Sequence, residues 1–121
     1  MLLNDFFKIT HVEGHDKYIV NIVLNPNHKI YDGHFPGNPI VPGVCLTQMV
    51  KETVEHLTNK KLSIVTGDNI KFTAVLNPNI NPDITMSVSL KTNANGLLQA
   101  DCTVSGGDTS FFSFKGTMRE N

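Results

Sequence analysis

The chain lacks tryptophan, has only two cysteines, and has no hydrophobic run of the roughly 20 residues that a membrane span needs. Cys45 and Cys102 stand far apart with no CxxC, which favours free thiols in a reducing cytoplasm over a disulfide framework or zinc site. The formal net charge is only -1, so a broad nucleic-acid surface is not expected. Polar residues interrupt the first ten positions, which argues against a signal peptide. These absences predict a cytoplasmic protein without a membrane span or a nucleic-acid partner.

What is present is ordinary globular composition, 121 residues with 40% hydrophobic content. That length predicts one domain over residues 1–121, since two halves would each be too small to bury a core. So small a domain has little room for a deep pocket. A catalytic site is therefore expected to be shared between subunits.

The chain is rich in β-type segments and contains one clear helical pattern. Alternation and β-branched or aromatic content predict strands over 6–12, 18–24, 62–76, 83–91, 97–104 and 110–118. Residues 42–57 carry apolar side chains at helical spacing, with Gln48, Glu52 and Glu55 on the opposite and usually solvated face. The pattern predicts an α+β fold in which an antiparallel sheet of about six strands packs on one helix.

Residues 25–41 contain too much proline and glycine for a regular element, and such stretches in small domains usually serve function. The segment 33–44 reads GHFPGNPIVPGV, and its one titratable side chain is His34. A histidine titrates near neutral pH. Gly43 and Val44 open the helix, where N–H groups have no intrahelical partner and the helix dipole is positive. A proton acceptor beside such donors suits abstraction of a proton next to a carbonyl.

This twelve-residue segment resembles the signature of the 3-hydroxyacyl-[acyl carrier protein] dehydratases, and a weaker similarity extends over the whole chain. The resemblance implies a hotdog fold, in which a curved antiparallel sheet wraps one central helix. It also implies a homodimer, or a higher oligomer of dimers, with sites at the subunit interface. The substrate would be an acyl carrier protein thioester or an acyl-CoA thioester. Because elimination of water changes no oxidation state, no metal or redox cofactor is expected.

By position, the resemblance makes His34 the catalytic histidine and gives the oxyanion-binding N–H to Gly43 or Val44. The acyl chain would lie in an apolar tunnel, for which Phe35, Met49 and Phe72 are candidate lining residues, although each is equally compatible with plain core. Cys45 lies in the first helical turn, where a thiolate would be stabilised, but a small core residue is the commoner interpretation. His11 and His15 have a spacing that only weakly favours a metal site.

The sequence departs from the signature at the catalytic acid. In the family a carboxylate stands fourteen residues after the histidine, and here that position is Gln48, which cannot donate and recover a proton as a carboxyl can. Many relatives have a glutamine four residues further on, where this chain has Glu52. Residues i and i+4 are neighbours on a helix, about 5–6 Å apart at Cβ. We therefore expect Glu52, from the partner subunit, to protonate the departing hydroxyl, with Gln48 orienting the substrate or holding Glu52.

Three functions follow from these residues. The first is dehydration of a 3-hydroxyacyl thioester to a trans-2-enoyl thioester, with His34, Glu52 and Gln48 at the site. The second is a hotdog thioesterase, which would release free thiol. The third is a non-catalytic acyl-binding or scaffold subunit, the silent half of a heterodimer, which the glutamine at position 48 favours. In that third case Glu52 is only a solvated residue of the helix surface.

Overall fold

The computed structural model describes residues 1–33, 37 and 39–121. The predictions for His34 and Phe35 lie outside the described residues. The described chain contains one α-helix, α1 (Gly43–Thr58), and a short 3₁₀ helix, η1 (Lys29–Asp32). Its strands are β1 (Phe7–His15), β2 (Lys17–Leu24), β3 (Leu62–Phe72), β4 (Asp83–Thr92), β5 (Leu98–Gly106) and β6 (Thr109–Glu120).

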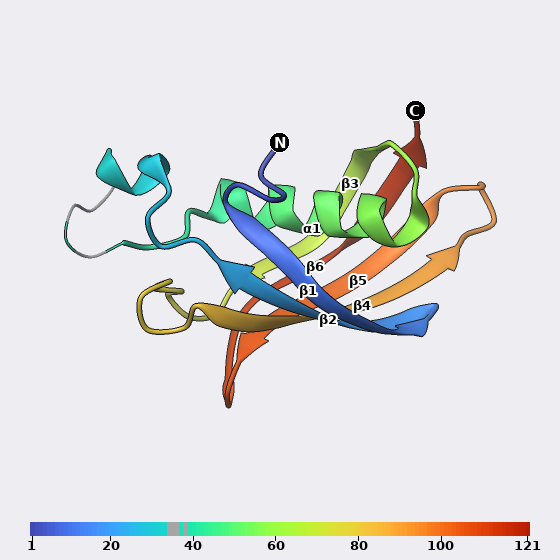
Figure 1. Ribbon diagram of the computed structural model, residues 1–121. Coiled ribbons are helices and arrows are strands. Elements are labelled where there is room, and N and C mark those ends of the chain that lie inside the picture. Colours follow the sequence, from blue (N-terminus) through green and yellow to red (C-terminus); the bar gives the residue numbers. More distant parts are fainter. Residues whose placement is uncertain (34–36, 38) are drawn as a thin grey trace.

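The strands form one antiparallel sheet in the order β1-β2-β4-β5-β6-β3. The sheet curves around α1, which lies across its inner face (Figure 1). Tight turns join β1 to β2 and β5 to β6, where Asp16 and Gly107 have positive φ angles of 65° and 58°. Since β3 follows the helix and pairs with β6, the chain passes over β4, β5 and β6 between β2 and the opposite edge of the sheet.

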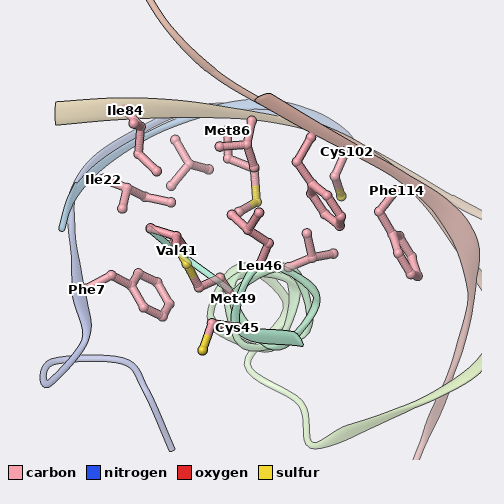
Figure 2. Packing of buried hydrophobic residues seen from close by; sticks show 14 of the residues in the cluster. Phe7, Ile22, Val41, Cys45, Leu46, Met49, Ile84, Met86, Cys102 and Phe114 are labelled. Atoms are coloured by element: carbon pink, nitrogen blue, oxygen red, sulfur yellow. The ribbon is translucent and has the colours of Figure 1, made fainter. Parts of the chain in front are cut away.

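The core lies between the helix and the inner face of the sheet (Figure 2). Leu46, Met49 and Val50 of α1 are almost fully buried there, and Met86 and Phe114 approach them from the sheet. Burying an aliphatic or aromatic side chain of this size contributes roughly 1.5–3 kcal/mol. Packing of the apolar stripe on the sheet therefore holds α1 in place, as its sequence pattern predicts.

Three details differ from the sequence prediction. Pro42 is the N-cap of α1 rather than a residue of its first turn, because its backbone is extended, with ψ of 148°. The irregular stretch contains η1, which begins where the His28 side chain accepts a hydrogen bond from the N–H of Ile30. Strand β3 ends at Phe72 rather than at position 76, and within it register shifts near Gly67 and Asp68 leave its pairing to β6 intact.

Strand β3 is an edge of the sheet, and it is unusually exposed and apolar. It pairs only with β6 within the described chain, and all its residues from Val65 to Phe72 are exposed. Among the large hydrophobic side chains that face solvent, Val65, Ile70 and Phe72 belong to this strand. An unpaired strand edge with apolar side chains favours pairing with another chain.

In the part of the chain that the structure describes, no helix has the length and apolar character needed to cross a membrane.

Candidate functional site

The start of α1 is fixed by contacts with the end of β3 and with the segment that follows it. Val41 donates its N–H to the carbonyl of Leu76 at 2.9 Å, which ties the approach to the helix to the segment after β3. Phe72, at the end of β3, packs directly on Gly43, since a Cβ at position 43 would lie 2.7 Å from two of its ring atoms. Phe72 also packs against Phe112 in a tilted arrangement, with ring centroids 5.1 Å apart. A side chain at position 43 would therefore force the Phe72 ring to shift.

The first two N–H groups of the helix are available to a ligand. Cys45 and Leu46 donate to the carbonyl of Pro42 at 3.0 and 3.1 Å, whereas the N–H groups of Gly43 and Val44 make no hydrogen bond with described residues. Pro42 gives no side-chain cap. Two free donors at the positive end of the helix dipole can stabilise an oxyanion. The oxyanion-binding role that the sequence gives to Gly43 or Val44 stays a prediction.

Glu52 is not a solvated residue, and that interpretation of the helix surface is wrong. Its side chain is buried and only 2% exposed. One carboxylate oxygen accepts the N–H groups of Leu2 and Leu3 at 2.9 and 2.8 Å. The other accepts from Leu2 at 2.9 Å and from Nε2 of Gln48 at 2.8 Å. The N-terminal segment thus covers Glu52, which explains why a residue of the polar face is buried.

These contacts determine the charge of Glu52. Burial alone would raise its pKa, but hydrogen bonds from Leu2, Leu3 and Gln48 outweigh burial and lower the pKa below its ordinary value. The side chain is consequently a carboxylate at neutral pH and acts as a hydrogen-bond acceptor. Gln48 occupies the position of the family's acid, and its hydrogen bond joins that position to the Glu52 carboxylate.

The other predicted site residues lie in different environments. Val44 is 77% exposed and Phe72 59% exposed, so both present apolar surface near the helix start. Met49 is fully buried in the core, where it contributes to packing. Cys45 is buried as well, and burial raises its pKa, which does not favour a thiolate.

Tyr31 is a polar residue near the motif that the sequence did not single out. It lies on η1, is only 6% exposed, and packs on Phe6 with ring centroids 5.6 Å apart. Its hydroxyl is buried without a hydrogen-bond partner in the described structure. Burial, and then the nearby Cys45 thiol, raise its pKa. In the sequence, only its position three residues before His34 indicates that Tyr31 lies near the motif.

The remaining histidines take structural or surface roles. His28 caps η1 and its Nε2 lies 3.1 Å from Asp5, so it is more enclosed than a surface residue. His11 contacts Glu13 at 3.0 Å. Outside positions 34–36 and 38, no group of three or more metal-ligating side chains comes together.

The curved six-stranded sheet around one helix, with free donors at the helix start, defines an α+β protein of the hotdog fold. The chain belongs to the ApeI-like dehydratase family, because the model of that family, described as ApeI dehydratase, matches residues 10–108. The family resemblance predicted from the sequence is thereby confirmed.

Individual relatives agree with this assignment. The 3-hydroxyacyl-[acyl-carrier-protein] dehydratase FabZ of Caulobacter sp. (strain K31) is 29% identical over 94 residues, covering 77% of this chain and 53% of FabZ. The chain thus spans about half the length of such curated relatives.

Two solved structures share the fold. A chain of the dehydratase heterocomplex ApeI:P from Xenorhabdus doucetiae matches with a TM-score of 0.65 at 21% identity, over 91% of this chain and 95% of that chain. An uncharacterized protein from Erwinia carotovora subsp. atroseptica matches with a TM-score of 0.58 at 23% identity, over 92% and 91%. At these identities the likeness is one of fold.

Proposed function

We propose that this protein removes water from a 3-hydroxyacyl thioester borne by a carrier protein, giving the trans-2-enoyl thioester. The observation that carries the proposal is the pair of free N–H groups at Gly43 and Val44, which end the twelve-residue motif that contains His34. Such donors match the enolate oxygen that develops when a proton leaves the carbon next to a thioester carbonyl. Family membership supports the same class of reaction.

His34 is proposed as the base that takes the α-proton. The C–H and C–O bonds break, the double bond forms between the two carbons, and the hydroxyl leaves as water after receiving one proton. The imidazolium formed at His34 holds that proton and can return it, so proton transfer balances without a second acid.

We propose Glu52 as a positioning residue rather than the proton donor expected from the sequence. Its lowered pKa keeps it ionised, and protonation would weaken its hydrogen bonds from Leu2, Leu3 and Gln48. Through Gln48 Nε2, Glu52 fixes the orientation of an amide whose other donor and acceptor groups can bind the departing hydroxyl. Gln48 is then the substrate contact.

A second candidate is a subunit that binds the acyl thioester and is completed by a different chain carrying a carboxylate at the position of Gln48. The hydrogen bonds that Glu52 accepts within the chain favour this candidate, since Glu52 is then not free to serve as the acid in a partner subunit's site. The related ApeI:P assembly is a dehydratase heterocomplex.

Either candidate is proposed to act as a dimer, and the apolar β3 edge is the proposed contact. Val65→Lys places a charge on this edge and is expected to halve the solution mass. Ile19→Lys is the matched control, because Ile19 is similarly exposed, 46% against 43% for Val65, but lies on interior strand β2. Equal masses for both variants and the wild type would argue against this interface.

The function itself is tested by giving the purified protein a 3-hydroxyacyl carrier-protein thioester and following enoyl thioester and free thiol together. Enoyl product without thiol release is the expected result. Thiol release without enoyl product identifies a thioesterase instead. If neither product forms although the thioester binds, the second candidate is favoured over the dehydratase.

A further inference from the structure

His28 contacts two separate parts of the chain, and the proposed reaction gives it no role. Its Nδ1 accepts the N–H of Ile30 at 3.1 Å, which caps η1. Its Nε2 lies 3.1 Å from a carboxylate oxygen of Asp5, and its ring meets that of Phe6 in a T-shaped arrangement with centroids 5.3 Å apart. The side chain is only 11% exposed. His28 therefore joins η1 to residues 2–6, the N-terminal turn that precedes β1.

The cap determines where the proton of the His28 ring lies. Because Nδ1 accepts from a backbone N–H, it carries no proton, so Nε2 holds the ring proton and donates a hydrogen bond to Asp5. A charged ring would have a proton on Nδ1 that points at the N–H of Ile30, and the cap would be lost. The neutral ring, in this one tautomer, is thus the form that makes both hydrogen bonds.

The loop before η1 contacts the N-terminal turn as well. Nδ2 of Asn25 donates to the carbonyl of Asp5 at 3.0 Å, and the backbone N–H of Asn25 donates to the carbonyl of Phe6 at 2.9 Å. Tyr31 of η1 packs on the Phe6 ring, with centroids 5.6 Å apart. The N-terminal turn therefore holds the segment that leads into the motif, where His34 follows η1 by two positions in the sequence.

The N-terminal turn also contacts α1, beside which it lies (Figure 1). Leu2 and Leu3 donate their N–H groups to the buried carboxylate of Glu52. Glu52 in turn accepts from Nε2 of Gln48. The turn is closed by the N–H of Phe6, which donates to the carbonyl of Leu2 at 2.7 Å. One short turn thus holds both η1 and the polar side of α1.

We propose that His28 is a positioning residue for the reaction, because it holds the segment that carries His34 on the N-terminal turn that orients Gln48. The inference rests on the proposed function, in which these two residues are the base and the substrate contact. A cap alone would keep the shape of η1, but it would not fix η1 relative to α1. The hydrogen bond from His28 to Asp5 supplies that second restraint.

Two variants separate the cap from the link to the N-terminal turn. Asparagine is a favoured N-cap, so His28→Asn keeps an acceptor for η1 but is too short to reach Asp5, whereas His28→Ala loses both contacts. We expect His28→Ala to raise the unfolding equilibrium constant roughly fivefold, and His28→Asn to reverse most of that change. In both variants kcat on the 3-hydroxyacyl carrier-protein thioester should fall roughly tenfold, with KM changed less than about twofold. Recovery of kcat together with stability in His28→Asn would make His28 a cap only and overturn the inference.

His11→Ala is the matched control. Nε2 of His11 lies 3.0 Å from a carboxylate oxygen of Glu13, so the pair resembles that of His28 and Asp5, but it belongs to β1. Its removal is expected to change kcat less than about twofold. An equal loss of kcat in His11→Ala and His28→Ala overturns the inference.

Hydrogen exchange separates this inference from the proposed function. The N–H of Leu3 donates to Glu52 at 2.8 Å, so its exchange rate reports, without turnover, how firmly the N-terminal turn is held on α1. His28→Asn should speed this exchange roughly tenfold, whereas His11→Ala should leave it unchanged. Equal rates in the wild type and His28→Asn overturn the inference, even if the wild type forms enoyl thioester. Faster exchange in His28→Asn, with a wild type that forms no enoyl thioester, contradicts the proposed function and leaves the link between η1 and α1 standing.

Discussion

The polar groups at the two ends of α1 differ in whether they have hydrogen-bond partners. At the motif end, Gly43 and Val44 have N–H groups without partners, and the nearby Tyr31 hydroxyl is also unpaired. Towards the distal end, Glu52 accepts from three groups, and Glu55 accepts the N–H of Leu62 at 2.8 Å and lies 3.5 Å from Lys51. The Thr53 hydroxyl is the exception there.

The difference separates groups that maintain the fold from groups that are left for a ligand. An unpaired buried hydroxyl, such as that of Tyr31 or Thr53, costs the fold about 1–3 kcal/mol unless another group satisfies it. Glu52 looks like a catalytic candidate in the sequence, yet its hydrogen bonds are used within the chain. The unpaired donors at the motif end are backbone N–H groups, so no residue type in the sequence marks them.

The largest expected effect comes from the motif. His34→Ala should lower the rate of enoyl formation by about 10²–10⁴-fold, because it removes the proposed base. His56→Ala, an exposed residue at the distal end, should change it less than about twofold. Steady-state kinetics check both, with urea unfolding to verify that each variant is folded. An equal loss in the two variants would remove the functional distinction between the ends.

The next effect is on stability and concerns Glu52. Glu52→Ala should lower the free energy of unfolding by about 2 kcal/mol at neutral pH, since it removes hydrogen bonds to a charged group. Because the folded-state pKa of Glu52 is lowered, its contribution is complete above the ordinary value of 4.5 and disappears as the pH falls through the folded-state value. Urea unfolding over a pH series checks this. If the difference in unfolding free energy between variant and wild type stays constant as the pH falls into the acid range, the account is contradicted.

A smaller effect is expected where Phe72 meets Gly43. Gly43→Ala places a methyl group against the Phe72 ring and should cost about 1–3 kcal/mol. Phe72→Ala makes room for that methyl, so the cost of Gly43→Ala should shrink in the double variant. A double-mutant cycle of unfolding free energies measures this coupling. Strict additivity would mean that the ring does not constrain the helix start.

The smallest effect is expected at Tyr31. Tyr31→Phe removes a buried hydroxyl that has no partner, so the free protein should keep its stability within about 1 kcal/mol or gain slightly. Thermal unfolding without ligand is the measurement. A clear loss of stability would show that the hydroxyl is already paired in the free protein, and the contrast between the two ends would weaken.

Most of the fold could be predicted from the sequence, because the helix and each strand have a strong periodicity of their own. The helix was placed within a residue at each end, and all six strands were recognised. The end of β3 was less accurate, since the strand stops at Phe72 rather than at position 76, and its pairing to β6 continues across bulges near Gly67 and Asp68. A local sequence pattern does not show where a strand leaves its partner or where a bulge lets the pairing continue.

The site was less predictable, and Glu52 shows why. Its burial depends on the backbone N–H groups of Leu2 and Leu3, about fifty positions away, and a backbone donor leaves no trace in the residue type. The helical pattern placed Glu52 opposite the apolar stripe, where nothing in the helix itself indicates a covering segment. The environments of Met49 and Phe72 also depend on tertiary packing, which buries one and exposes the other.

Turnover by Glu52→Gln tests the central claim most directly. The variant keeps the shape of the side chain and an acceptor for Gln48, but it can no longer carry a charge or a proton. If Glu52 positions Gln48, kcat per folded molecule should stay within about tenfold of the wild type while the free energy of unfolding falls. A loss of kcat by orders of magnitude with unchanged stability would contradict the account and make Glu52 the proton donor.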